Sequence, residues 1–243
     1  ELSKNNDITV VTAEKAESFK KGNLDFQSLN LFDQELSVDD KEIYLQEFKT
    51  KLCELIDLES FDVIHAHYWL SGLVAKQIKE EFNIPIIFTS HSLGIFLDGY
   101  NKERVDCEKI IMNASNVVTA SSMYEETMII ENYRIDSSKI KLITPGVEKE
   151  IFTPDSTIMR ENIFLSRGRI QEQKGQIETI KFLDNFRKIE NNFLCYFIGG
   201  PSGKSGNEYF EELKKSITDL NLESHVEFLG SLSQSKIKDL MNR

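Results

Sequence analysis

The stretch VIHAHYWLSGLVAKQIKEEFNIPIIFT, residues 63–89, decides the fold class of this 243-residue chain. It opens with a short apolar run at residues 63–66, continues into an amphipathic segment at 70–82 and closes with an apolar, β-branched run at 84–89. This order is typical of a βαβ unit, in which a helix joins two parallel strands. The same alternation continues along the chain, which predicts an α/β protein with doubly wound, Rossmann-like sheets.

Further strands and helices are expected along the rest of the chain. Several expected strands are apolar nearly throughout, as in parallel strands that are covered on both faces. The other expected strands are residues 8–12, 116–120, 140–143, 163–166, 193–198 and 226–229. The other expected helices are residues 40–58, 103–114, 123–133, 175–189, 208–220 and 235–242.

The series of elements is interrupted around residues 145–155, where two prolines and a glycine stand and no periodic apolar pattern survives. We therefore expect two Rossmann-like domains with parallel sheets, residues 1–152 and 158–243. Both are expected to be incomplete. The first lacks the strand and loop that normally open such a sheet, and the second has only three expected strands.

The charge balance narrows the range of partners. The chain has 29 basic and 40 acidic residues, a net charge of −11. Because such a surface repels phosphate backbones and anionic lipid, nucleic acid and membrane surfaces are not expected partners. Three widely spaced cysteines argue against a disulfide framework or a zinc site and favour a reduced, cytoplasmic setting. No apolar run approaches the roughly 20 residues of a transmembrane helix.

Candidate site residues follow the expected strands, because ligands of open α/β sheets bind beyond the carboxyl ends of the strands. His65 and His67 end one strand, and we expect them to diverge and not to share a metal ion. His67 lies nearer the mouth of the sheet, whereas a buried polar role is an equal alternative for His65. His91 and Ser92 follow the next strand and can hydrogen-bond a ligand, while Gly94 lets the backbone turn close to it.

The strongest candidate is the stretch SRGR, residues 166–169, followed by Lys174 and Gly175. Arg169 and Lys174 lie five residues apart across a strand-to-helix loop and can both face the helix N-terminus, where the dipole favours an anion. Arginine grips a phosphate with two donors and lysine adds a point charge. The alternative is a solvated basic loop. In this acidic chain we favour a phosphate site.

Glycines 199 and 200 follow the next strand and permit close approach of a ligand, although a plain turn would also require glycine. The nearby Gly203, Lys204 and Ser205 do not complete a phosphate loop, because Gly199 lies in the wrong register and no helix is expected to start there. An ATPase is therefore excluded. A dinucleotide-binding Gly-x-Gly-x-x-Gly segment does not occur either, which argues against a dehydrogenase.

Five stretches, taken in order, resemble the large retaining glycosyltransferase family that includes sucrose-phosphate synthase, sucrose synthase and bacterial mannosyltransferases. They are residues 61–69, 89–94, 145–148 with Phe152 and Pro154, 166–169 with Lys174 and Gly175, and 198–200. The resemblance covers residues 61–243 well and the first sixty loosely. The Tyr-Trp and His-Ser-Leu-Gly stretches are most similar to the branch of sucrose-phosphate synthase.

The resemblance implies the two-domain GT-B architecture, with the sugar donor held in the cleft between the domains. It also implies transfer of a hexosyl group from a nucleotide-diphosphate sugar to a sugar or small-molecule acceptor, with retention of anomeric configuration and without a metal or other cofactor. The residues implied are His91, Arg169 and Lys174 for catalysis; Gly168, Arg169, Lys174, Gly199 and Gly200 for the donor; and His67, Ser92 and Gly94 near the reacting sugars.

Two elements of that family are not found, namely an N-terminal glycine-rich loop and a later Glu-x7-Glu segment that contacts the donor. The chain by itself is therefore expected to be inactive. The alternative function is a non-catalytic α/β binding domain, or an inactive remnant of such an enzyme.

Overall fold

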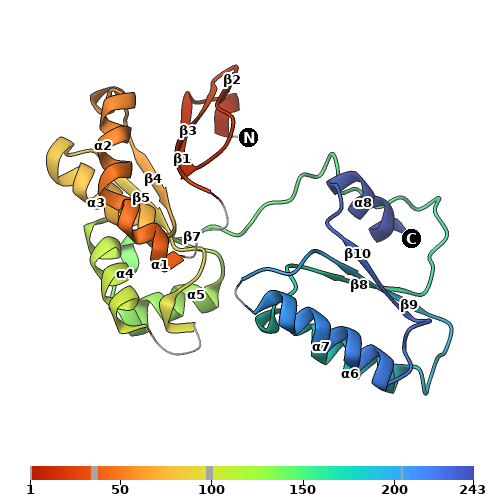
Figure 1. The fold of residues 1–243 in the computed structure, drawn as a ribbon. Coiled ribbons are helices and arrows are strands. Elements are labelled where there is room, and N and C mark those ends of the chain that lie inside the picture. Colours follow the sequence, from red (N-terminus) through yellow and green to blue (C-terminus); the bar gives the residue numbers. More distant parts are fainter. Residues whose placement is uncertain (1, 34–37, 97–100, 204) are drawn as a thin grey trace. The chain divides into compact units, whose positions relative to one another are not determined.

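The computed structural model describes residues 2–33, 38–96, 101–203 and 205–243 (Figure 1). The chain divides into two compact units, Glu1–Pro145 and Gly146–Arg243. Each unit has its own sheets and its own buried core. None of the described helices combines the length and the apolar character needed to cross a bilayer.

The main sheet of the first unit has four parallel strands in chain order. They are β4 (Ile64–His67), β5 (Ile86–Thr89), β6 (Val117–Ala120) and β7 (Ile140–Leu142). The connecting helices are α3 (Tyr68–Phe82), α4 (Lys102–Ala114) and α5 (Met123–Met128), the last continuing as a π-helical turn, Ile129–Tyr133. The βαβ order expected from the sequence is confirmed here.

Three of the described helices, two in the first unit and one in the second, begin at a capping side chain. The side chains of Asn101, Ser122 and Ser233 accept hydrogen bonds from the backbone N–H groups of the first turns of α4, α5 and α8 (Gln234–Asn242). Such caps satisfy amide donors that have no partner within the helix. At its other end α3 stops at Asn83, whose φ of 55° is left-handed.

A mixed sheet precedes this βαβ series, and the sequence analysis expected only its first strand, at residues 8–12. Strands β1 (Ile8–Glu14) and β3 (Leu24–Phe32) are parallel, whereas β2 (Phe19–Lys21) pairs antiparallel with β3. The expectation of parallel sheets throughout is therefore wrong for these residues. Lys21 pairs with Leu24 across the two-residue turn of Gly22 and Asn23, a dipeptide typical of tight hairpins.

The expected helix over residues 40–58 is broken into shorter pieces. The structure contains α1 (Val38–Lys41), a 3₁₀ turn at Glu42–Tyr44, α2 (Leu45–Leu55) and a second 3₁₀ turn at Leu58–Ser60. The apolar side of α2 packs on α3 through Leu52, Val74 and Ile78, and Val11 and Leu29 of the mixed sheet pack against the same cluster. This second core fixes the mixed sheet to the rest of the first unit.

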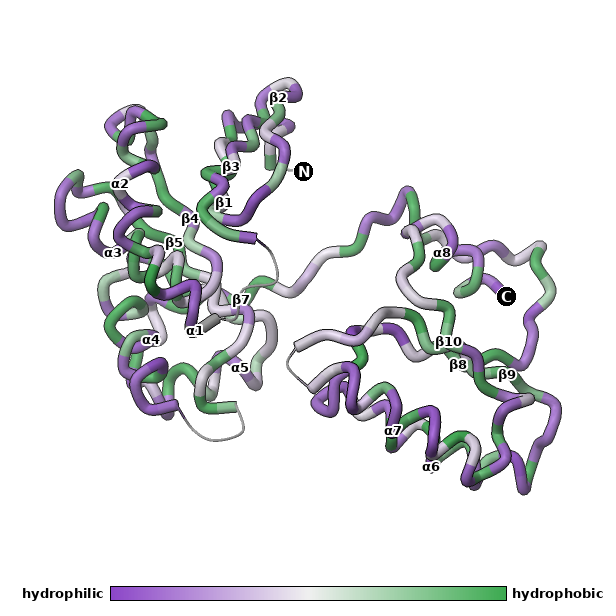
Figure 2. The backbone as a smooth tube through the Cα atoms, viewed as in Figure 1, coloured by the Kyte–Doolittle hydropathy of each residue, from purple (hydrophilic) through white to green (hydrophobic). Residues whose placement is uncertain are grey.

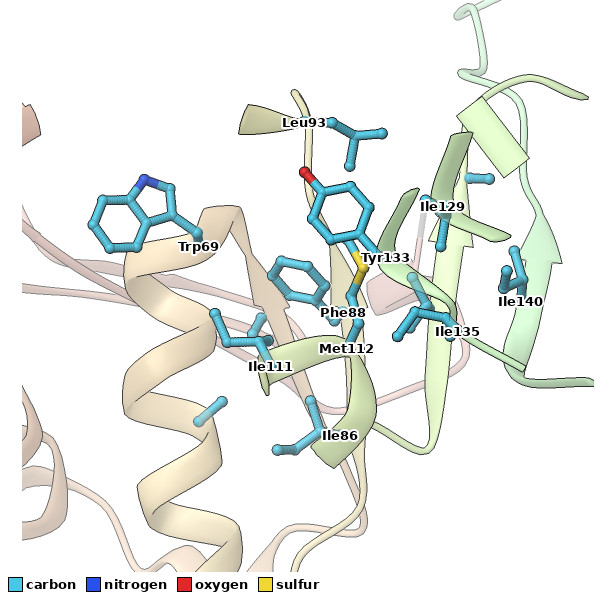
Figure 3. Packing of buried hydrophobic residues seen from close by; sticks show 14 of the residues in the cluster. Trp69, Ile86, Phe88, Leu93, Ile111, Met112, Ile129, Tyr133, Ile135 and Ile140 are labelled. Carbon is cyan, nitrogen blue, oxygen red and sulfur yellow. The ribbon is translucent and has the colours of Figure 1, made fainter. Parts of the chain in front are cut away.

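The principal core of the first unit lies between the main sheet and its helices (Figure 3). Ile86 and Phe88 of β5 are fully buried, as are Ile111 and Met112 of α4. Tyr133 belongs to the same cluster and is also fully buried. A buried tyrosine needs a partner for its hydroxyl, and that partner belongs to the candidate site described below.

The second unit has one sheet of three parallel strands in the order β10-β9-β8. They are β8 (Ile163–Arg167), β9 (Leu194–Ile198) and β10 (Val226–Gly230). Helices α6 (Gln176–Phe186) and α7 (Gly206–Asp219) lie side by side on one face (Figure 1), and α8 packs on the other through Ile237. Because α7 begins at Gly206, the expectation that no helix starts after Ser205 is wrong.

Alternate side chains of β9 serve the two faces of this sheet. Cys195 and Phe197 join the cluster that α6 and α7 cover, whereas Tyr196 and Ile198 join the cluster of Ile237. The strands are correspondingly apolar along their length, and α7 alternates between polar and apolar residues (Figure 2). Burial raises the pKa of the Cys195 thiol to about 12, so the thiol is protonated in the folded unit.

Replacing Gly72 by Ala should destabilise the first unit, although Ala normally favours a helix over Gly by about 1 kcal/mol. A β-carbon at Gly72 would lie 2.7 Å from Ile111 Cγ2 and 2.9 Å from Phe88 Cε2. Because both side chains are fully buried and have no room to move aside, we expect a net loss of about 1–3 kcal/mol in the free energy of unfolding. Chemical denaturation measures this difference.

The control is Glu80→Ala, on the exposed side of the same helix. Glu80 forms only a surface ion pair with Lys76, so this variant should stay within about 0.5 kcal/mol of wild type. A Gly72→Ala variant as stable as wild type, or more stable, would contradict the packing at Gly72.

Candidate functional site

Three imidazole rings gather at the carboxyl edge of the main sheet of the first unit. The rings of His65 and His67 on β4 have centroids 4.1 Å apart, and the ring of His91, which follows β5, is 5.0 Å from that of His67. The expectation that His65 and His67 diverge is wrong, because residues two apart on a strand point to the same face. Among the described residues no group of three His, Cys, Asp or Glu side chains could hold a metal ion.

The histidines are linked by hydrogen bonds to each other and to the neighbouring strands. His67 Nδ1 lies 2.8 Å from His91 Nε2. His65 Nε2 lies 2.8 Å from Thr89 Oγ1, which in turn lies 2.6 Å from Thr119 Oγ1. Partial burial, and then the nearby His67 and His91, lower the pKa of His65 to about 4. Partial burial and His91 also lower the pKa of His67, so both rings are neutral at pH 7.

A buried carboxylate holds the loop that carries His91. Glu108 on α4 is fully buried and accepts hydrogen bonds from the backbone N–H of Gly94, at 2.9 and 3.2 Å, and from Arg104 Nε at 2.8 Å. The Tyr133 hydroxyl donates to the same carboxylate. Burial and this hydrogen bond raise the pKa of Tyr133 above its ordinary value. Gly94 is itself buried and faces Glu108, since a β-carbon there would lie 3.2 Å from Glu108 Oε2.

Arg104 completes the attachment of this loop. Its guanidinium donates to Ser92 O at 2.7 Å, to Ser92 Oγ at 3.0 Å and to the Tyr68 hydroxyl at 3.2 Å. The Ser92 hydroxyl is therefore already engaged by a protein donor. His91 is exposed and has a φ of 59°, in the left-handed region that few non-glycine residues adopt. The structure thus presents His67 and His91 at the edge of the sheet, with Ser92 and Gly94 supporting the loop.

The glycines of the second unit bring its strand ends into contact. A β-carbon on Gly199 would lie only 2.0 Å from Gly168 O, and the φ of Gly199 is 136°. The Gly168 N–H donates to Ile198 O at 2.9 Å, and the Gly199 N–H donates to Gly230 O at 2.8 Å. No described atom lies within 4 Å of a β-carbon built on Gly200, so this residue borders open space.

Two cations lie at the same edge of the second unit. Lys174 Cγ and Cδ lie 3.9 Å from a β-carbon built on Gly168, so the lysine side chain passes over this glycine. Arg169 and Lys174 are both exposed, and in the part of the chain that the structure describes neither forms an ion pair. Lys174 ends a 3₁₀ turn, Gly175 follows with a φ of 66°, and α6 begins one residue later. The loop therefore places Lys174 beside the start of a helix.

The sequence analysis missed a buried residue that fixes this loop. Gln176, the first residue of α6, is 2% exposed, and its Nε2 donates to Arg169 O at 2.9 Å. Its Oε1 has no hydrogen-bond partner among the described residues. Gln176 thus ties the Arg169 backbone to the helix. Lys204, in the stretch that the sequence analysis excluded as a phosphate loop, lies outside the described residues.

A cavity of about 210 Å³ opens in the first unit beside the carboxyl end of β1 and the start of α3. Lys41, Tyr44 and Ser71 contribute polar groups to its lining. Lys41 Nζ lies 2.5 Å from Glu14 Oε1 and 5.2 Å from the centre of the Phe32 ring. The sequence offered no signal for this cavity, because Lys41 and Tyr44 read as ordinary positions of an amphipathic helix.

The two units, each with a parallel sheet and polar side chains at its carboxyl edge, have the organisation of the GT-B class of glycosyltransferases. The family model described as Glycosyltransferase Family 4 matches residues 1–151, and the model described as Glycosyl transferases group 1 matches residues 148–243. The chain belongs to glycosyltransferase family 4.

Among curated relatives, the D-inositol 3-phosphate glycosyltransferase of Acidothermus cellulolyticus is 29% identical over 198 residues, which cover 73% of this chain and 44% of the relative. The enzyme of the same name from Frankia alni is 32% identical over 198 residues, which cover 73% of this chain and 48% of the relative. The chain therefore spans about half the length of the relatives it matches.

Solved structures show the same fold. Sucrose-phosphate synthase from Thermosynechococcus elongatus has a TM-score of 0.84 at 19% identity, covering 99% of this chain and 64% of that protein. Anabaena HepE in complex with UDP and glucose has a TM-score of 0.67 at 17% identity, covering 90% of this chain and 58% of HepE. The GT-B fold expected from the sequence is confirmed.

Replacing His65 by Asn should reduce the pH dependence of stability between pH 6.5 and about 4. The pKa of His65 is lowered from 6.5 in the folded chain, so the unfolded chain binds more protons in this range. Stability is therefore lost as the pH falls through it, and a residue that does not titrate removes this contribution. Melting temperatures at about pH 7 and about pH 4.5 should differ more for wild type than for the variant. Equal differences would contradict the lowered pKa.

Replacing Gly199 by Ala should destabilise the second unit by more than about 2 kcal/mol, because it combines a strained φ with a collision against Gly168 O. Gly200→Ala is the matched control, since its β-carbon meets no described atom. Hydrogen exchange of the β9 amides, followed by mass spectrometry, should be faster in the first variant only. Similar protection in both variants would show that the strand ends are not in close contact.

Proposed function

We propose that this chain carries the donor site and part of the acceptor site of a retaining hexosyltransferase that uses a nucleotide-diphosphate sugar. The observation that carries the proposal is the pair of exposed cations, Arg169 and Lys174, which have no ion-pair partner within the described residues. In a chain with a net charge of −11, two such cations at the carboxyl edge of a parallel sheet favour an anionic ligand. Solved structures of Anabaena HepE are complexes with UDP and with UDP-glucose, which supports a uridine diphosphate donor.

The geometry of the second unit suits a diphosphate. Gly168 and Gly200 carry no side chains, so phosphate oxygens can approach the backbone closely. Lys174 passes over Gly168 and brings a positive charge to the same place. The leaving diphosphate gains negative charge as the glycosidic bond breaks, and fixed cations stabilise that charge without reorganisation. We therefore propose a metal-independent reaction in which Arg169 and Lys174 stabilise the leaving group.

We assign the transferred sugar to the exposed histidines of the first unit. His91 lies at the carboxyl edge of the sheet, and a neutral imidazole nitrogen can exchange a hydrogen bond with a sugar hydroxyl. His67 bonds to the other side of this ring. Ser92 and Gly94 act through the loop that they stabilise.

We assign the acceptor to the cavity beside β1 and α3. Its lining combines the Lys41 ammonium, the Glu14 carboxylate and the hydroxyls of Tyr44 and Ser71 with apolar side chains. This mixture suits a polyhydroxylated molecule, whose hydroxyls both donate and accept hydrogen bonds. The curated relatives act, by their names, on a phosphorylated cyclitol, D-inositol 3-phosphate. Lys41 is the cation of this lining, and a phosphate there would compete with Glu14 for it.

Lys174→Ala should weaken binding of UDP and, in the intact enzyme, reduce turnover by roughly 10² to 10³, the usual cost of removing one preorganised donor of charge stabilisation. Arg169→Lys should also be damaging, because lysine keeps the charge but loses the two-donor grip on a phosphate. Calorimetry measures the affinity for UDP, and nucleotide release from UDP-sugars in the presence of candidate acceptors measures turnover. Circular dichroism checks the fold.

Lys181→Ala is the matched control, because Lys181 is an exposed lysine on α6 that pairs with Glu178 away from the strand mouth. It should bind UDP as wild type does. If Lys174→Ala and Arg169→Lys fold and bind UDP as tightly as this control, the two cations belong to a solvated loop. Binding of UDP without nucleotide release from any donor would favour the non-catalytic binding domain instead.

A further inference from the structure

The bond between His67 and His91 imposes a condition on both rings. Two nitrogen atoms at 2.8 Å cannot face each other with lone pairs only, so one of them carries the hydrogen. A neutral imidazole has one N–H group and one acceptor nitrogen. If His67 Nδ1 donates, His91 Nε2 is bare and His91 carries its hydrogen on Nδ1. If His91 Nε2 donates instead, His67 Nδ1 is bare and carries its hydrogen on Nε2.

Both rings therefore have the same tautomer, either Nδ1–H or Nε2–H. The remaining nitrogen of His91, Nδ1, is a donor in the first case and an acceptor in the second. Within the described residues the His91 side chain forms no other hydrogen bond, so the tautomer that it presents to a ligand is coupled to that of His67. The tilted contact of the His65 ring with the His67 ring, whose centroids lie 4.1 Å apart, restricts the orientation of the His67 ring.

We propose that His67 is a positioning residue, which fixes the orientation and the tautomer of His91 and thereby sets the hydrogen-bonding role of His91 toward the transferred sugar. The role of His91 toward the sugar rests on the proposed function. The coupling between the two rings can be measured without any substrate. The lowered pKa of His67 supports it, because a neutral ring can serve as either partner of the bond.

Two substitutions of His67 separate the hydrogen bond from the ring stack. His67→Phe keeps an aromatic ring beside His65 but has no nitrogen to bond His91. His67→Asn has no ring, yet its amide places an oxygen or a nitrogen where Nδ1 stood, and this amide can donate or accept. If the hydrogen bond positions His91, His67→Asn should preserve the orientation and the hydrogen bonding of the His91 ring, and His67→Phe should not.

Imidazole ¹⁵N spectra of the whole chain provide the primary measurement. The chain has only four histidines, and His225 lies in the second unit with Nδ1 3.1 Å from Phe193 O. Because a carbonyl oxygen only accepts, neutral His225 must be the Nδ1–H tautomer, which supplies an internal reference. At about pH 8, where free imidazole is neutral, His67 and His91 of wild type should share one tautomer.

In His67→Phe the Nε2 signal of His91 should become that of a nitrogen without a protein partner, whereas in His67→Asn it should remain that of a hydrogen-bonded nitrogen. The His225 signals should be unchanged in both variants, which excludes general unfolding. Opposite tautomers for His67 and His91 in wild type, or an unchanged His91 in His67→Phe, would overturn the proposal.

Turnover gives a second, independent readout. His67→Phe should lower kcat by roughly 10- to 100-fold, since a small misplacement of a positioned group can cost up to about 10². Its affinity for UDP should not change, because no part of the diphosphate site is altered. In the intact enzyme His67→Asn should lose less kcat than His67→Phe, because the amide can still bond His91. Equal kcat for both variants would overturn the positioning role. An intact wild-type enzyme that releases no nucleotide would count against the proposed function, and the tautomer measurement would still test the coupling of the two rings.

Discussion

The hydrogen bonds and the ion pair of the buried Glu108 carboxylate hold the elements of the first unit together at the edge that presents His91. A fully buried negative charge is tolerated only when it is paired and fully hydrogen-bonded, and here Arg104, Tyr133 and the Gly94 amide meet that requirement together. These groups come from α4, from the π-helical turn after α5 and from the loop after β5, and Arg104 extends the network to Tyr68 at the start of α3. Losing any partner would leave buried charge uncompensated. The edge that presents His91 is thus built as one electrostatic unit.

In the second unit, glycines and not a buried ion pair shape the carboxyl edge of the sheet. The contact between Gly168 and Gly199 leaves no room for a β-carbon, and it brings adjacent strand ends to the same edge. Lys174 can then lie across Gly168, and Gln176 fixes the loop through the Arg169 carbonyl. The cations themselves keep no carboxylate partner within the described residues. A ligand at the proposed donor site would therefore have no internal counter-ion to displace.

Most strands and helices of the two units could be predicted from the local sequence pattern, because parallel strands and their connecting helices have strong periodic signals. The strand-end segments around His91, Arg169 and Gly199 were found for the same reason. The hydrogen-bond network of Glu108 was not predicted. Arg104 and Glu108 are four residues apart, and such a pair is usually an ion pair on the exposed side of a helix. Only tertiary packing reveals that both are buried. The hairpin at β2 and β3 was missed although its Gly-Asn turn is a local signal, because β2 has only three residues, two of them lysines, and polar residues interrupt the apolar pattern of β3.

Because the two units have separate cores, the buried Cys195 can report the unfolding of the second unit alone. Its thiol lies inside the second unit and has a pKa of about 12, so it offers almost no thiolate to an alkylating reagent while that unit is folded. Cys53 and Cys107 of the first unit are only half-buried. The rate at which Cys195 alone becomes alkylated therefore reports how often the second unit opens, independently of the first. The chain thus carries a native chemical probe of whether its two halves unfold together or one at a time.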